Sequence, residues 1–277
     1  ADRGDYPPGV QQKVKKYFTL AKISWSNGFA YRLNFAMWRV RQILSLLTAY
    51  FLWKAIFSIS HKGIFGYSES MMMAYIFVSA FVQTVVLSVR SIDLAGVINS
   101  GELSNILVRP VSNFWYWISR DAADKILNSL FSLGELALLF FLLKPTFVFP
   151  AFPFVLLMIP ALFLAAFLYY LISYFFSLLG FWTPDVWAPR FFLFILLQFT
   201  AGTLFPLDVL PQYIQRIISW TPFPSLVYIP TQIFLMRYSV AGITGNLAIG
   251  SLWVLIFLAV VRLTWTKGLR RYSSEGR

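Results

Sequence analysis

Six apolar runs of 17 to 28 residues dominate this sequence. An α-helix needs about 20 apolar residues to cross the hydrocarbon core of a bilayer, so runs of this length are typical of membrane-spanning helices. Of the 277 residues, 58% are hydrophobic and only 12% are charged, which leaves too little polar surface to cover a soluble protein of this size. The sequence therefore predicts an all-α membrane protein with six transmembrane helices.

The predicted helices form a transmembrane domain over residues 43–265. Their approximate ranges are 43–60, 71–89, 115–143, 154–181, 191–207 and 247–265, with 126–143 as the apolar part of the third. Most of the connections between the apolar runs are short. A long polar connection, residues 90–125, separates the second apolar run from the third.

A second long connection, about residues 208–240, is nearly as apolar as a helix. Four prolines divide it into pieces that are too short to cross a bilayer, namely Pro211, Pro222, Pro224 and Pro230. Non-helical backbone is tolerated at membrane depth only where protein or water satisfies its polar groups. We therefore expect a re-entrant helical hairpin between the fifth and sixth helices.

The two ends of the chain are polar. Residues 1–11 combine charges, prolines and glycine, which predicts a disordered tail. Residues 12–42 predict an amphipathic segment whose helix, over about 12–31, lies in the membrane surface, with a solvated basic arm as the alternative. The apolar face of this helix comprises Val14, Phe18, Ala21 and Trp25. Residues 266–277 predict a basic cytoplasmic tail.

The distribution of Lys and Arg indicates how the chain is oriented in the membrane. Of the 23 Lys and Arg, eighteen fall on the side of the predicted spans that holds both termini, and five fall on the other side. Because cytoplasmic loops carry the excess of these residues, we expect both termini in the cytoplasm. The net charge of +12 fits this topology and anionic lipid, so no nucleic acid partner is expected.

Motifs of the common soluble enzymes are missing from the sequence. No Lys is followed by Ser or Thr, so the phosphate-binding GxxxxGK[ST] loop of P-loop ATPases is absent. The GxSxG and HExxH motifs are absent too, and the chain has no Cys and a single His. We therefore expect no catalytic residue, no bound cofactor and no metal site.

The polar connection contains a stretch with the start and stop signals of a short helix. Ser100 and Gly101 precede it, Glu102 suits its positive end, Arg109 suits its negative end, and Pro110 stops it. This pattern predicts a surface helix over about 101–110. An ordinary solvated loop helix is the plain alternative.

Charged residues follow this stretch at helical spacing. Arg120 and Asp124 are four residues apart, and so are Asp121 and Lys125. Residues at this spacing are neighbours on a helix surface, so we expect these two pairs to form along one helix at the cytoplasmic interface.

Glu135 lies near the middle of the third apolar run. A carboxylate at the centre of a bilayer costs roughly 2 to 4 kcal/mol unless it is paired or protonated. Two interpretations stay open. Glu135 contacts the substrate or another subunit, or it is a protonated group in a structural hydrogen bond.

Three motifs together carry a family resemblance over nearly all of the chain beyond residue 12. They are GELSNILVRP at 101–110, FPLDVLP at 205–211 and GLRRYSSEG at 268–276. The chain resembles the type-two permeases of ATP-binding-cassette exporters, in particular a bacterial branch. That resemblance implies a multi-pass subunit of the bacterial plasma membrane, paired with a second permease that is identical or homologous, among membrane lipid. It also implies two cytosolic ATPase subunits, which bind the ATP and Mg²⁺.

The resemblance also implies roles for particular residues. The amphipathic segment over 12–42 is an elbow before the first helix, and a coupling helix in the first cytoplasmic loop docks on the ATPase. The coupling residues are Gly101, Glu102, Leu103, Leu107, Arg109 and Pro110. The second and fifth helices line the substrate path, with neutral hydrogen bonds between helices as the alternative role of their polar groups. The candidate path residues are Tyr75, Ser79, Gln83, Glu135, Phe194 and Gln198.

The predicted function is therefore a permease subunit of an exporter that moves a hydrophobic or amphipathic substrate. An ion-driven secondary transporter is the first alternative, although only Glu135 is a central ionisable residue and ion relays normally use several. A membrane-embedded enzyme is the second, and it is disfavoured because His, Asp and Glu are not clustered.

Overall fold

The structure is a computed structural model that describes residues 32–59, 63–109 and 112–272. Every regular element within these ranges is a helix, and the one β-type contact is an isolated bridge between Ile64 and Tyr67. The long helices are α2 (Arg32–Ile59), α3 (Glu69–Leu87), α6 (Asn113–Leu143), α7 (Phe152–Leu178) and α11 (Val240–Leu269). Each of them is long and apolar enough to cross a membrane, which confirms the predicted all-α membrane class.

The fifth predicted crossing, 191–207, corresponds to a shorter helix. α8 (Trp187–Thr200) has 14 residues, or about 21 Å at the rise of an α-helix, against a hydrocarbon core of about 30 Å. The helix stops there because Gly202 takes a left-handed conformation, with φ at +77°. Among the described residues five helices qualify as spans, and the sixth crossing stays a prediction.

Two helix boundaries differ from the sequence prediction. α2 begins at Arg32, so residues 32–42 continue the first long helix rather than forming part of a separate amphipathic segment. α11 begins at Val240, where the Ser239 hydroxyl accepts a hydrogen bond from the Gly242 N–H. It continues to Leu269, so the predicted tail starts inside a helix. The predicted disordered tail, the helix over 12–31 and residues 273–277 lie outside the described residues.

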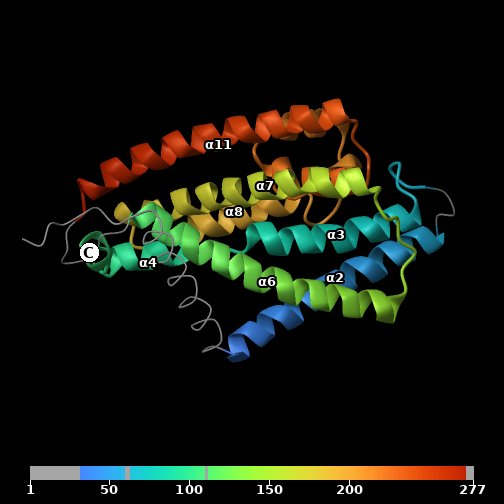
Figure 1. Cartoon of the computed structure of the whole chain (residues 1–277), viewed down its shortest axis with the longest axis horizontal. Helices are drawn as coiled ribbons and strands as arrows, with labels where there is room; N and C mark the ends of the chain where they lie inside the picture. The colour runs from blue at the N-terminus through green and yellow to red at the C-terminus, as the bar shows by residue number, and fades with distance from the viewer. Residues whose placement is uncertain (1–31, 60–62, 110–111, 273–277) are drawn as a thin grey trace, which may run out of the picture.

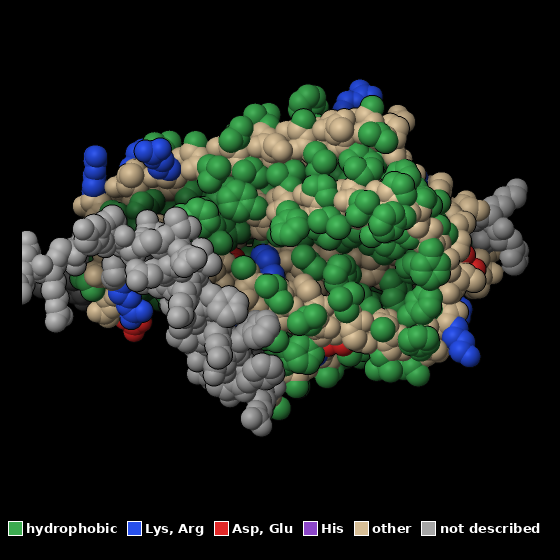
Figure 2. All heavy atoms as spheres, viewed as in Figure 1, with side chains coloured by type: hydrophobic (Ala, Val, Ile, Leu, Met, Phe, Trp, Pro, Cys, Tyr) green, Lys and Arg blue, Asp and Glu red, His purple; other side chains and the backbone are tan. Residues whose placement is uncertain are grey.

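The long helices run roughly along the long axis of the molecule, with α2 crossing the others obliquely (Figure 1). α3 is central, because it packs against α2, α6, α7 and α10 (Tyr228–Phe234), while α11 packs along α7. Figure 2 shows hydrophobic side chains over the middle of one face and most of the visible Lys and Arg near its two ends. This distribution is typical of a protein whose middle is surrounded by lipid.

The proline-rich connection before α11 is a series of short helices in the half of the molecule away from α4 (Leu94–Asn99) (Figure 1). The pieces are η3 (Leu207–Val209), α9 (Gln212–Ser219), η4 (Phe223–Ser225) and α10. The prolines lie at or just before their first turns, where the missing N–H costs no hydrogen bond. The predicted division into short pieces is confirmed, and the re-entrant hairpin stays a prediction.

Candidate functional site

A cavity of about 170 Å³ lies between α2, α3, α6 and the turn that follows α8. Five of the six residues predicted for the substrate path line it, namely Tyr75, Ser79, Gln83, Glu135 and Gln198. Phe194, on α8, does not line it and is 45% exposed. The structure thus brings together polar residues from helices that are far apart in the sequence.

The cavity has a mixed lining. Besides the predicted residues it is lined by the polar groups of Gln42, Ser45, Thr84, Ser132 and Thr203, and by the apolar side chains of Trp53, Ile76, Leu136 and Leu139 among others. Pockets for drug-sized ligands usually have volumes of about 300 to 1,000 Å³, so this cavity is too small for such a ligand without rearrangement.

Hydrogen bonds tie α3 to the turn after α8 along the cavity wall. The Tyr75 hydroxyl donates to the Gly202 carbonyl at 2.6 Å, and the Gln83 amide donates to the Thr203 carbonyl at 3.3 Å. The Thr203 hydroxyl donates to the side-chain carbonyl of Gln198 at 2.8 Å. These contacts fit the structural alternative for the polar path residues, and they leave a role in transport as a prediction.

Glu135 is paired with a cation that the sequence analysis did not connect to it. The Arg39 guanidinium lies 3.4 Å from the Glu135 carboxylate, and Arg39 is only 9% exposed at its side chain. The guanidinium also lies over the rings of Phe35 and Phe131, at 5.1 and 5.6 Å from their centres. In the sequence Arg39 belongs to a run of basic residues before the first apolar run, where nothing marks it as buried.

The helix predicted over 101–110 corresponds to a shorter helix, α5 (Leu103–Leu107), and a turn joins it to another short helix, α4, that precedes the predicted range. α4 follows η1 (Ser91–Asp93). Gly101 lies between them with φ at +79°, a conformation that favours glycine, so it ends one helix rather than starting the next. We refer to residues 91–109 as the coupling segment.

The predicted coupling residues divide into exposed and buried groups. Glu102, Leu107 and Arg109 are exposed, as expected for a docking surface. Leu103 is fully buried and Gly101 is buried, so these two residues hold the segment in place and cannot contact a partner in this conformation. Pro110 lies outside the described residues.

The C-terminal motif anchors the coupling segment. The Tyr272 hydroxyl donates to the Gly101 carbonyl at 2.5 Å and accepts a hydrogen bond from the Ser104 N–H at 3.1 Å. The Tyr272 ring contacts Phe181, which also contacts Trp265 of α11. Two of the motifs that are far apart in the sequence therefore meet at this end of the molecule.

Gly268 provides a test of this packing. A Cβ atom at Gly268 would lie 2.1 Å from a ring carbon of the buried Phe181, whereas one at Gly245 in the same helix would meet nothing within 4 Å. We expect Gly268→Ala to destabilise the protein by about 1 to 3 kcal/mol through overpacking. Gly245→Ala should be neutral or slightly stabilising. Melting temperatures in detergent test this, and equal values for the two variants would contradict the packing described.

Asp121 and Lys125 lie near enough on α6 for their charges to attract each other, but they do not form the predicted direct ion pair. The Asp121 carboxylate accepts hydrogen bonds from the backbone N–H groups of Arg90 and Ser91, at 2.5 and 2.8 Å. The Lys125 ammonium donates to the carbonyls of Val86 and Ser88, at 2.7 and 2.5 Å. The junction between α3 and η1 leaves these backbone groups without helical partners, and α6 supplies partners for them.

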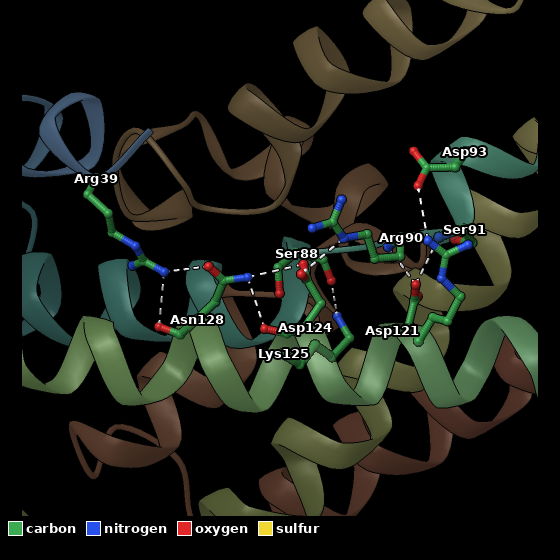
Figure 3. A network of polar contacts seen from close by, with 10 residues as sticks. Arg39, Ser88, Arg90, Ser91, Asp93, Asp121, Asp124, Lys125 and Asn128 are labelled. Carbon is green, nitrogen blue, oxygen red and sulfur yellow. Dashed lines mark hydrogen bonds and ion pairs between the residues drawn. The ribbon is translucent and has the colours of Figure 1, made fainter. Parts of the chain in front are cut away.

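Asp124 is also engaged from outside its own helix. Its carboxylate accepts a hydrogen bond from Nε of Arg90 at 3.1 Å, and Arg120 lies 3.8 Å from Asp93 of η1 (Figure 3). α6 therefore holds the junction between α3 and the coupling segment through carboxylates and a lysine (Figure 3). The helical spacing of the charges was visible in the sequence, but their partners on another helix were not.

A second polar cluster lies in the half that contains the proline-rich connection. The Asp208 carboxylate accepts hydrogen bonds from the hydroxyls of Tyr67 and Tyr228, at 2.5 and 2.9 Å, and from the side-chain amide of Gln232 at 2.9 Å. Burial, reinforced by the Asp208 charge, raises the pKa of Tyr67 well above its usual value, so the phenol stays protonated and donates. Asp208 belongs to the FPLDVLP motif, and sequence analysis gave it no role.

The described residues contain no group of three or more His, Asp and Glu that could hold a metal ion.

Comparison with known proteins identifies a family. A sequence model of the family described as ABC-2 family transporter protein matches residues 43–276, which is most of the chain. No curated protein matches it. The matched range includes the coupling segment, the whole C-terminal motif and every residue that lines the cavity except Gln42.

Proposed function

Since this chain belongs to the ABC-2 family of transporter proteins, we propose that it is the permease subunit of an exporter driven by separate ATPase subunits. Membrane subunits of this family are transport subunits that associate with ATP-binding-cassette ATPases and typically have no ATPase site of their own. The exporter direction, the second permease and the substrate class are our inference.

The coupling segment is the observation that carries this proposal. Its exposed residues include Glu102, Leu107, Val108 and Arg109, and Val108 is 82% exposed. They stand on a base fixed by the buried Leu103 and by the Tyr272 hydrogen bonds. An apolar patch beside an acid and a base on a rigid support suits a protein partner that pushes on it.

The rest of the proposal concerns location and assembly. The protein lies in a bacterial plasma membrane with both termini in the cytoplasm, next to lipid and to a second permease that is identical or homologous. ATP and Mg²⁺ bind to the two ATPase subunits, and nucleic acid has no part. A hydrophobic or amphipathic substrate passes between the permeases, beside helices that line the cavity.

The lining of the cavity, once the cavity enlarges to admit a drug-sized ligand, supports the substrate class in this proposal. Its amides and hydroxyls lie next to Trp53 and Tyr75, so it offers hydrogen bonds and aromatic contact to one ligand. The ion-driven alternative gains no support, because the acid at the centre of the third predicted span is engaged by Arg39.

The coupling segment gives a direct test by charge reversal. We expect Glu102→Lys and Arg109→Glu to reduce co-purification of the ATPase, or to uncouple its hydrolysis from the permease, because both side chains are exposed where we propose that the ATPase docks. Glu69→Lys is the matched control, since Glu69 is also exposed but begins α3 at the other end of that helix. If both coupling variants retain ATPase co-purification and hydrolysis equal to those of the control, this docking surface is wrong.

A further inference from the structure

A series of polar contacts runs along α6 from Arg90, the residue before the coupling segment, to Arg39 (Figure 3). Arg39 extends the series to Glu135 in the cavity wall. Asp124 accepts from Arg90 at its Nε and from the amide of Asn128, both at 3.1 Å. The side-chain carbonyl of Asn128 accepts from the Arg39 guanidinium. Arg39 in turn lies 3.4 Å from Glu135, which lines the cavity.

These contacts join α2 and α6 to Arg90, which lies between α3 and the coupling segment. Arg90 immediately precedes η1, Arg39 comes from α2, and the other members come from α6. Val86 and Ser88 at the end of α3 are held by Lys125 of the same helix, α6. All three helices line the cavity farther along their length, α3 through Ser79 and α2 through Gln42.

Two charged members of the series are largely buried, so each depends on its hydrogen-bond and ion-pair partners. Arg39 has 9% of its side chain exposed and Asp124 has 17%. Charged groups at such low exposure have lost most of their hydration, so they move together with their partners or exchange them for others. A displacement of Arg90 therefore changes the contacts of Asp124, and through Asn128 those of Arg39.

We propose that the polar series Arg90–Asp124–Asn128–Arg39–Glu135 transmits movement of the coupling segment to the cavity, with Asp124 as the positioning residue that joins its two halves. The inference rests on the proposed function, because it needs an ATPase to move the coupling segment. It goes further by assigning the transmission to named side chains within the membrane domain.

Because the sequence has no cysteine, a single introduced thiol can be labelled selectively. The variant that carries it is called the reporter. Ser79→Cys places one thiol in the cavity wall, and its rate of reaction with a small maleimide is measured in the complex with the ATPase, with and without ATP and vanadate. We expect ATP and vanadate to change the rate at which the Ser79→Cys thiol reacts with the maleimide. In Asp124→Ala we expect that change to shrink about fivefold or more, the size of a typical coupling between sites.

Two variants separate transmission from simple stability. Asp124→Glu keeps a carboxylate for Arg90 and should restore the nucleotide response, while Ser129→Ala, which removes a hydroxyl bonded within α6, should leave it unchanged. The nucleotide responses are compared in complexes that have co-purified with the ATPase. If Asp124→Ala does not assemble, Asp124→Asn removes the charge with little change of shape and serves in its place.

The outcomes that overturn the inference are distinct from those that overturn the proposed function. A nucleotide response in Asp124→Ala or Asp124→Asn equal to that of the reporter overturns the inference. So does a reporter without a response in a complex that hydrolyses ATP. Failure of any ATPase to co-purify with the reporter overturns the proposed function, and the inference with it.

Discussion

Replacing Arg39 by methionine is expected to destabilise the protein by about 3 kcal/mol, because it leaves the Glu135 carboxylate in the membrane domain without its cation. The loss includes the hydrogen bonds from Arg39 to Gln42 and Asn128. Methionine keeps most of the length of the side chain, so the cavity left behind is small. The measurement is the free energy of unfolding in mixed micelles, or the melting temperature in detergent.

The matched control lies in the same helix. Arg41 is exposed and lies over the ring of Trp38 at 5.1 Å, so Arg41→Met should cost less than about 1 kcal/mol. Adding Glu135→Gln to Arg39→Met should recover much of the lost stability, because no unpaired charge then remains. Equal stability of the two arginine variants, or no recovery in the double variant, would show that the pair is unimportant.

Asp208→Ala is expected to cost about 3 kcal/mol or more, because it leaves the donors of Tyr67, Tyr228 and Gln232 without their acceptor. Tyr67 is fully buried and Gln232 is 1% exposed, so water does not replace the carboxylate easily. Since Tyr67 precedes α3 and Gln232 lies in α10, the variant should loosen the proline-rich connection from the rest of the fold.

Limited proteolysis and the melting temperature measure this effect. Cleavage between residues 207 and 240 should accelerate in Asp208→Ala. Asp93→Asn serves as the control, since Asp93 has 44% of its side chain exposed and its contact with Arg120 is long, at 3.8 Å. An exposed pair of that kind contributes less than about 1 kcal/mol. Similar proteolysis and melting of the two variants would contradict the role given to Asp208.

The sequence predicted what depends on local patterns. Long apolar runs located the five long helices, because a bilayer demands both length and low polarity. Prolines located the short helices α9 and α10, because a proline begins a helix more readily than it continues one. Glycine was more ambiguous, and Gly101 proved to end a helix rather than to start one.

What the sequence did not predict depends on contacts between distant residues. Arg39 and Glu135 are 96 positions apart, and Tyr67 and Asp208 are 141 apart. The charges of α6 were expected to pair within the helix, because their spacing allows it, and Asp121 and Lys125 instead bind backbone groups of the junction between α3 and η1. Spacing shows which residues share a face and leaves open what packs against that face.

The predicted site residues divide in the same way. The polar residues of α3 share one face of that helix at helical spacing, and this face lines the cavity together with Glu135. Phe194 on α8 is exposed and does not line it. Leu103 was assigned to the docking surface by resemblance alone. Its burial follows from the apolar spacing of Leu94, Ile98, Leu103 and Ile106, all of which the structure buries.

The most direct test of the central claim is purification of the tagged full-length protein from its native membrane in a mild detergent, followed by mass spectrometry of the intact complex. We expect this chain with a second permease and two copies of a P-loop ATPase, and hydrolysis of ATP by that complex. A homogeneous protein that carries no ATPase and retains transport in vesicles driven by an ion gradient alone would contradict the account.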